Sequence, residues 1–368
     1  MKKLVLFFLL LLASQGSYAQ KTKIKTKGAA TSTTAAGQRW SAEKAQAWHK
    51  TQPWLSGANF TPSTAINQLE MWQAATFDPT TIDKELGYAE SIGFNVMRVF
   101  LHSLAWQQDP KGFKDRLNTY LGIADKHHIR TMFVFFDDCW NNDAKVGLQP
   151  APKPGIHNSG WLQDPGDPAS RDSTTFIKLK PYVQDVLSSF KSDKRILLWD
   201  LYNEPGNRGK LASSLPLVRN VFAWAREVNP DQPLSVGLWN WDFQALNSYQ
   251  AQHSDIITYH NYDDVAAHQR VIELLETHNR PLICTEYMAR TRNSRFSNIM
   301  PLLKKQNVGA INWGLVDGKT NTKYQWETPL PDGSEPIEWF HEVFRKDGTA
   351  YRQDETDLIK KLNAKNVQ

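Results

Sequence analysis

Eight short apolar runs recur along residues 54–314, and helix-like segments lie between most of them. Several runs are apolar at nearly every position, which is typical of parallel strands buried on both faces. They cover residues 54–60, 94–101, 129–136, 195–202, 233–239, 255–260, 281–287 and 308–314. Amphipathic segments cover residues 79–91, 111–127, 174–191, 211–228, 265–278 and 295–306. Because strands and helices alternate, we predict a parallel sheet built from βα units.

Eight such units indicate an α/β fold of the (β/α)8 type, the TIM barrel. An open, doubly wound sheet is the alternative, but no G-x-G-x-x-G phosphate loop follows any strand, and that loop is the usual reason to prefer it. We expect a single domain over residues 39–368, with extended loops at the C-terminal face of the strands. The longest of these is a Pro-, Gly- and Trp-rich insertion at 137–173.

The first nineteen residues have the pattern of a secretory signal peptide. Lys2 and Lys3 precede an unbroken apolar run at 4–13, and small residues lie at 17 and 19, before the predicted cleavage point. A retained membrane anchor is the alternative, but the apolar run is too short to span a bilayer. We therefore predict a secreted or periplasmic protein with no membrane association after cleavage.

A lysine-rich tail follows at residues 20–38, with too few apolar side chains to order itself. The chain carries a net charge of +5, and the six lysines within residues 2–27 exceed that whole surplus, leaving residues 28–368 near neutrality. A near-neutral body does not favour nucleic-acid binding. The two cysteines, Cys139 and Cys284, are few for an exported protein, so we expect two free thiols.

Two of the predicted strands end in a glutamate. The fourth reads R-I-L-L-W-D-L-Y-N-E-P and ends at Glu204, and the seventh reads R-P-L-I-C-T-E-Y and ends at Glu286. A single glutamate in such a place is as readily a turn residue as a catalytic one. In a barrel, however, both would lie at the C-terminal mouth, where catalytic residues are found. Two neighbouring carboxyl groups are what a retaining glycosidase requires.

With these motifs, the chain resembles a clan A glycoside hydrolase, close to the cellulase-like family 5, over about residues 50–350. The resemblance implies that Glu204 is the acid/base and Glu286 the nucleophile. It implies that Asn203, of N-E-P, binds the sugar 2-hydroxyl. It also implies that Arg98, of V-M-R-V-F, lies under the nucleophile and keeps it ionised.

Three aromatic or imidazole side chains at strand ends extend this resemblance. His260 and Tyr262, of T-Y-H-N-Y, match a histidine lining the site and a tyrosine that orients the nucleophile, and Trp313, of I-N-W-G, matches the platform under the sugar. Each alone is more often a buried core residue. Fourteen tryptophans in 368 residues further favour stacking on sugars, and we include Trp140 and Trp239 among the predicted substrate-binding residues.

The end of the third strand departs from the family pattern. Family 5 enzymes usually have a histidine there, whereas this chain reads F-F-D-D-C-W, with Asp137 and Asp138. We predict Asp137 as a further substrate-binding residue that hydrogen-bonds sugar hydroxyls, the alternative being a cap for the insertion. The departure leaves a neighbouring clan A family as an alternative to family 5.

The resemblance implies a retaining β-glycosidase similar to a cellulase, xylanase or mannanase. Its expected substrate is a β-linked polysaccharide or oligosaccharide, with a β-1,4 linkage preferred. No cofactor and no metal are expected, and we predict a monomer. Two alternatives stay open: a carbohydrate-binding barrel without catalysis, and an exo-glycosidase of a neighbouring clan A family. The sugar and the exo or endo mode are not decided by the sequence.

Overall fold

The computed structural model describes residues 37–166 and 172–364, which belong to one compact unit. Its centre is an eight-stranded, all-parallel sheet with the order β5-β4-β3-β2-β1-β8-β7-β6. The strands are β1 (Ser56–Asn59), β2 (Val96–Phe100), β3 (Arg130–Asp137), β4 (Ile196–Asn203), β5 (Leu234–Ser235), β6 (Ile257–His260), β7 (Leu282–Glu286) and β8 (Gly309–Asn312). The predicted parallel sheet is confirmed.

The sheet closes into a barrel between β5 and β6. Leu238, just after β5, bridges Tyr259 of β6 in parallel register, and its amide and carbonyl bond to Thr258 and His260 at 3.0 and 2.8 Å. Closure removes both sheet edges and places the C-terminal ends of all eight strands around one opening. The predicted (β/α)8 fold is therefore correct.

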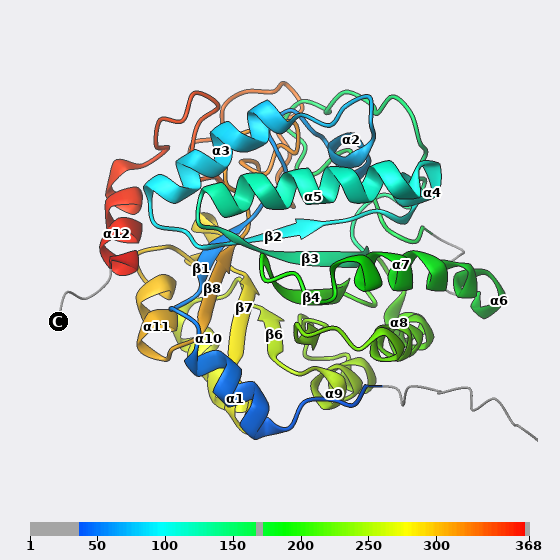
Figure 1. Ribbon diagram of the computed structural model, residues 1–368. Coiled ribbons are helices and arrows are strands. Elements are labelled where there is room, and N and C mark those ends of the chain that lie inside the picture. Colours follow the sequence, from blue (N-terminus) through cyan, green and yellow to red (C-terminus); the bar gives the residue numbers. More distant parts are fainter. Residues whose placement is uncertain (1–36, 167–171, 365–368) are drawn as a thin grey trace, which may run out of the picture. The chain divides into compact units, whose positions relative to one another are not determined.

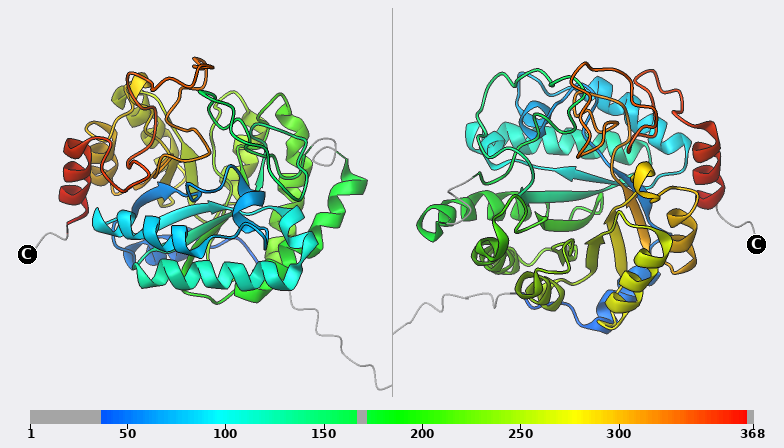
Figure 2. Two further views of the ribbon diagram at one scale, coloured as in Figure 1. Left: turned by 90° about the horizontal axis from the view of Figure 1, so that it is seen from above. Right: turned by 180° about the vertical axis from the view of Figure 1, so that it is seen from behind.

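Helices surround this barrel (Figures 1 and 2). They are α1 (Ala42–Lys50), α2 (Gln68–Trp72), α3 (Pro79–Ser91), α4 (Ser103–Gln108), α5 (Pro110–Lys126), α6 (Ser173–Phe176), α7 (Lys180–Phe190), α8 (Leu215–Val228), α9 (Gln244–His253), α10 (Val265–Glu276), α11 (Ile299–Lys305) and α12 (Gln353–Asn363). Short 3-10 turns lie at Ile177–Leu179, Leu211–Ser214 and Arg290–Arg292. In the described ranges no helix is both long and apolar enough to cross a membrane.

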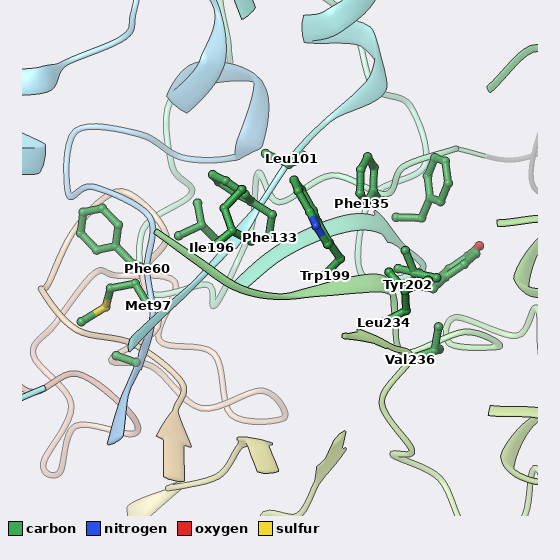
Figure 3. Close-up of a cluster of buried hydrophobic side chains, with 14 of the residues drawn as sticks. Phe60, Met97, Leu101, Phe133, Phe135, Ile196, Trp199, Tyr202, Leu234 and Val236 are labelled. Atoms are coloured by element: carbon green, nitrogen blue, oxygen red, sulfur yellow. The ribbon is translucent and has the colours of Figure 1, made fainter. Parts of the chain in front are cut away.

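Side chains alternate along each strand between the helices and the barrel interior. On β2, Met97 and Val99 join the large outer core under the helices, while Val96 and Phe100 belong to inner clusters. Figure 3 shows part of the outer core, including Phe133 and Trp199. This alternation sends Arg98 into the interior, where it reaches the site.

Several elements differ from the sequence prediction, among them α2, α4 and α12, which were not predicted, and α9, α1 and β5. Helix α9 was not predicted, because its sequence QALNSYQAQH is polar and buries only Leu246, Gln250 and Ala251. Helix α1 was not predicted either. It packs Ala45 against the inner core at the N-terminal ends of the strands, opposite the cavity. Strand β5 spans only two residues, whereas residues 233–239 were expected.

The N-terminal predictions fall mostly outside the described residues. The signal peptide at 1–19 and tail residues 20–36 are not part of the structure described. Residues 37 and 38 have no regular secondary structure, and the Gly37 amide donates to the Arg226 carbonyl at 2.7 Å.

Candidate active site

A cavity of about 610 Å³ opens at the C-terminal ends of the strands. A volume of this size suits a small-molecule site. Eight of the ten residues predicted from the sequence line it: Trp140, Asn203, Glu204, Trp239, His260, Tyr262, Glu286 and Trp313. The other two, Arg98 and Asp137, are 0 and 2 % exposed and do not line the cavity.

Glu204 and Glu286 face each other in this cavity. One carboxylate oxygen of Glu204, one of Glu286 and a ring nitrogen of His260 all lie within 4.8 Å of one another. The side chains of the two glutamates are only 13 and 6 % exposed. The predicted pairing of two carboxyl groups from different strands is thus present in the fold.

The backbone turn after β4 aims Glu204 into the cavity. Glu204 has a φ of 43°, in the left-handed region, and Gly206 follows at 92°. A residue other than glycine costs about 1 kcal/mol there, and such strain gathers at functional sites. At Gly206 a Cβ would lie 2.9 Å from the Leu211 carbonyl oxygen, so the turn requires glycine.

Glu286, the last residue of β7, accepts hydrogen bonds from two directions. Arg98 Nη1 donates to Oε1 at 2.8 Å, and the Tyr262 hydroxyl donates to Oε2 at 2.8 Å. The Glu286 carbonyl also accepts from the Asn261 amide at 3.0 Å, which fixes the end of β6 beside the end of β7. Both side-chain donors favour the ionised carboxylate.

Arg98 connects three strands inside the barrel. Its Nε and Nη2 contact Asp200 Oδ2 at 2.9 and 2.8 Å, and its Nη2 donates to Asn203 Oδ1 at 2.7 Å. Its Nη1 also donates to Asn59 Oδ1 at 2.9 Å. The guanidinium therefore holds Glu286 and Asn203 at fixed positions while Asp200 balances its charge.

Glu204 has different partners. His260 Nδ1 lies 2.9 Å from Oε1, while Asn207 Nδ2 and Cys139 Sγ donate to Oε2 at 2.5 and 3.1 Å. Unlike Glu286, Glu204 has no arginine and no tyrosine hydroxyl on its carboxylate among the described residues. A thiol is a weak donor, so this environment favours ionisation less than that of Glu286.

Asp137, the last residue of β3, lies beneath the cavity surface and accepts hydrogen bonds from residues of the site. Its Oδ1 accepts from Asn203 Nδ2 at 2.9 Å and from the Cys139 amide at 2.8 Å, and its Oδ2 accepts from Trp161 Nε1 at 2.7 Å. Asp137 is buried and does not line the cavity, so the expectation that it hydrogen-bonds sugar hydroxyls is corrected: it positions Asn203 and Trp161.

Asp138 holds the turn that carries Glu204. Its carboxylate accepts from Tyr202 OH, Lys210 Nζ and Ser214 Oγ at 2.8, 2.7 and 2.5 Å, and from the Gly206 amide at 2.8 Å. These donors come from both sides of Glu204 in the sequence. The acidic pair at the end of β3 therefore organises the end of β4.

Burial raises the pKa of both catalytic candidates. On Glu286 the neighbouring Glu204 carboxylate raises the pKa further, while the Arg98 charge and the Tyr262 hydroxyl lower it. Burial lowers the pKa of His260 to about 4, so this imidazole is neutral at neutral pH. Two carboxyl groups in unlike environments are the usual basis for separate acid and nucleophile roles.

Within the described ranges, one group of side chains has its potential ligand atoms close enough together to hold a metal ion: Glu204, His260 and Glu286. The Arg98 guanidinium on Glu286 opposes a further cation there. The arrangement is better suited to carboxylate chemistry than to metal binding.

The predicted tryptophans lie around the carboxylates. Trp313, after β8, is 9 % exposed and packs edge-on against Phe100 and Trp161 at 5.7 Å between ring centres. Trp239, after β5, donates from Nε1 to the Pro205 carbonyl at 3.1 Å and so fixes the turn beyond Glu204. Trp140 lies in the insertion, with the Arg208 guanidinium 5.4 Å from its ring centre.

Among the residues of the site that were not predicted are Cys139, Asn207 and Asp200. Asp200 is an acidic residue inside an otherwise apolar strand, two positions from Leu198 and Tyr202, and this signal was available in the sequence. The contact of Cys139 with Glu204 had no sequence signal, because it depends on how β3 and β4 end beside each other. Both cysteines are free, as predicted, and both are buried.

A closed parallel barrel with two facing carboxyl groups at its C-terminal opening defines the class of (β/α)8 hydrolases that act on glycosidic bonds. Residues 57–319 match the cellulase family, glycosyl hydrolase family 5. The chain belongs to this family, and it is a glycoside hydrolase. The family 5 expectation is confirmed despite the missing histidine after β3. No curated protein matches the chain.

Solved structures of this family share the fold at low sequence identity. A GH5_18 protein of Streptomyces cattleya, in complex with Manb1-4GlcNAc, is 12 % identical with a TM-score of 0.58, covering 84 % of this chain and 80 % of its own. The endo-beta-1,4-mannanase of Thermotoga petrophila is 13 % identical with a TM-score of 0.54, covering 84 and 76 %. The exo-beta-1,4-mannosidase Op5Man5 of Opitutaceae bacterium strain TAV5 is 15 % identical with a TM-score of 0.57, covering 84 and 59 %.

Proposed function

We propose that this glycoside hydrolase cleaves β-glycosidic bonds with retention of anomeric configuration, using Glu286 as the nucleophile and Glu204 as the acid/base. The observation that carries the proposal is the separation of at most 4.8 Å between oxygens of the two carboxylates. Retaining enzymes have their carboxyl groups about 5–5.5 Å apart, whereas inverting enzymes leave about 6.5–9.5 Å for a water molecule.

The partners of each carboxylate support the division of roles. A nucleophile must be ionised before the reaction, and Glu286 accepts from Arg98 and Tyr262. An acid must carry a proton at the working pH. Glu204 is buried, and no cationic side chain among the described residues bonds to its carboxylate, since the neighbouring His260 is neutral.

The reaction then follows in two steps. Glu286 attacks the anomeric carbon, the bond to the glycosidic oxygen breaks, and that oxygen takes the proton of Glu204 as it leaves. In the second step Glu204 removes a proton from water, the water oxygen attacks the anomeric carbon, and the ester bond to Glu286 breaks. Each step inverts the configuration, so the product retains it. Asn203, fixed between Arg98 and Asp137, is placed to hold the sugar 2-hydroxyl.

For the substrate we propose a β-linked glycan, with β-1,4-linked oligosaccharides first. The structural neighbours include a mannanase, a mannosidase and a complex with Manb1-4GlcNAc, so manno-oligosaccharides belong in the first panel beside gluco- and xylo-oligosaccharides. The tryptophan-lined cavity provides flat apolar surfaces for sugar rings.

The test is hydrolysis of a panel of aryl β-glycosides, with the newly formed anomer followed by proton NMR before mutarotation. The expected first product is the β-anomer. An α-anomer formed first would contradict retention, and no hydrolysis of any substrate would favour the alternative of a carbohydrate-binding barrel without catalysis.

For the location we propose export to the periplasm or medium, on the basis of the basic start and the apolar run at residues 4–13. The mass of the mature N-terminus from the native host tests it. A start at Gln20 is expected, and an intact Met1 would contradict it.

A further inference from the structure

One side of the active-site cavity is bounded by a continuous row of ring side chains, here called the aromatic wall: Trp140, His157, Trp326 and Tyr262. Adjacent members touch, with ring centres 5.4 Å apart for Trp140 and His157, 6.2 Å for His157 and Trp326, and 4.9 Å for Trp326 and Tyr262. All four residues line the cavity. The aromatic wall therefore runs without a break from the loop after β3 to the loop after β6.

A second layer of buried rings supports the aromatic wall from behind. His341 is fully buried, and its ring centre lies 5.4 to 5.6 Å from those of His157, Trp326 and Tyr262. Phe340, also buried, packs against Trp326 at 4.8 Å. Because buried rings pack behind it, the aromatic wall keeps its position when a substrate enters.

The two long loops that carry the aromatic wall are joined by their backbones. The insertion after β3 and the segment after β8 exchange hydrogen bonds from Leu330 N to Gly155 O at 3.0 Å and from Asn158 N to Thr320 O at 2.8 Å. The imidazole of His157 is also within 2.7 Å of the Tyr324 carbonyl oxygen. The two loops therefore form one connected boundary.

The insertion also covers the side of the barrel opening next to β1 and β2. Asn67 and Gln68, after β1, donate to the carbonyls of Gly160 and Leu162 at 2.9 and 3.0 Å. As a result, none of the described residues from 60 to 138 lines the cavity. An extended groove across the barrel would need that side open, and here the protein fills it.

The catalytic pair gives this closed side a chemical meaning. Tyr262 belongs to the aromatic wall and donates a hydrogen bond to Glu286. The sugar that Glu286 attacks therefore lies against the aromatic wall. The leaving oxygen must meet Glu204, and beyond Glu204 the cavity is lined by residues 239–242 after β5. The departing part of the substrate therefore lies on the side away from the aromatic wall.

We propose that the cavity is an end-closed pocket with room for a single sugar residue before the cleaved bond, so that the enzyme removes residues one at a time from the non-reducing end of a β-linked chain. This inference rests on the proposed function, because it takes Glu286 as the nucleophile and Glu204 as the acid. It decides between exo and endo action, which the sequence left open.

The test uses borohydride-reduced hexasaccharides of β-1,4-linked mannose, glucose and xylose with the full-length enzyme, and product chromatography from the first minutes. The expected products are a monosaccharide and an alditol one residue shorter, with shorter alditols appearing only later. The Glu286→Ala variant, purified in parallel, should release neither and so excludes a contaminating glycosidase.

A second substrate carries a methyl group on O4 of its non-reducing-end residue, where an aromatic wall would meet it. We expect its kcat/KM to fall about 10- to 200-fold, the range that one misfitting methylene-sized group costs in a closed pocket. An unblocked groove would accept both substrates alike, so equal rates would overturn the inference.

The remaining outcomes separate this inference from the proposed function. Early di-, tri- or tetrasaccharide fragments would overturn the end-closed pocket and leave the retaining glycosidase standing. Cleavage of aryl β-glycosides without cleavage of any hexasaccharide would overturn the proposed removal of single residues from a chain. It would leave the retaining glycosidase standing. Failure to cleave any aryl glycoside or oligosaccharide would overturn both.

Discussion

The thiol of Cys139 lies 3.1 Å from Oε2 of Glu204, in the part of the chain where family 5 enzymes usually have a histidine at the end of the third strand. The same sulfur accepts from Asn207 Nδ2 at 3.3 Å and from Asn203 Nδ2 at 3.4 Å. Burial holds the pKa of this thiol well above its usual value, so it stays protonated and acts as a hydrogen-bond donor to Glu204, the proposed acid/base. Cys139 is thus a positioning residue for Glu204.

Removing this donor should shift the pH profile in a defined direction. The S–H donor favours ionised Glu204 and lowers its pKa, so Cys139→Ala should raise this pKa and move the basic limb of the kcat/KM profile to higher pH. Cys139→Ser keeps a donor and is the matched control, with its basic limb at or below that of the wild type. A basic limb that does not move in Cys139→Ala would contradict this role.

The two glutamates should be separable by azide rescue. Glu286→Ala and Glu204→Ala should each lower kcat on substrates with poor leaving groups by about 10³-fold or more. Azide added to Glu286→Ala should restore turnover and give the α-glycosyl azide, because azide replaces the nucleophile. Azide added to Glu204→Ala should give the β-glycosyl azide from the glycosyl-enzyme. The opposite pattern of anomers would exchange the two roles.

Arg98 should contribute to both stability and activity. Arg98→Met leaves Asp200 and Glu286 buried without a cation, and breaking a buried ion pair on one side costs about 3–5 kcal/mol of unfolding free energy. Denaturant unfolding measures the loss. The double variant Arg98→Met with Asp200→Asn should recover part of the stability but not the activity. Full recovery of both would show that Arg98 has no role toward Glu286.

Stability should fall between about pH 4.5 and pH 8 because of Glu342, which is buried beside Gly314. Burial raises its pKa from 4.5 to about 8, and within the described residues its Oε2 has no hydrogen-bond partner. The folded protein therefore binds a proton that the unfolded chain releases above pH 4.5. This stabilisation is complete below pH 4.5 and is lost as the pH rises through about 8. The difference corresponds to at most about 5 kcal/mol.

Glu342→Gln tests this dependence, because glutamine keeps the shape and cannot ionise. Its unfolding free energy should decline less than that of the wild type between about pH 5 and pH 9, measured by urea unfolding at each pH. Parallel curves for the two proteins would show that another group, such as Glu85 with its pKa raised to about 7, is responsible.

The sequence by itself determined the architecture and the two glutamates that face each other at the barrel opening. Apolar runs such as 195–202 and 281–287 require burial on both faces, and a glutamate at the end of each can only lie at the barrel opening. Local patterns failed where tertiary contacts replace periodicity. Helix α9 is held by a few buried side chains, and β5 shortens because closure to β6 passes through Leu238.

What only the tertiary structure decided is how the ends of different strands meet. Asp137 reads in the sequence as a sugar ligand, but the pairing of β3 with β4 places Asn203 and Trp161 on its two oxygens. The aromatic wall likewise joins residues 140 and 157 of one loop to residue 326 of another and residue 262 of a third. Such contacts depend on the relative placement of segments far apart in the chain, and no local pattern of side chains encodes that distance.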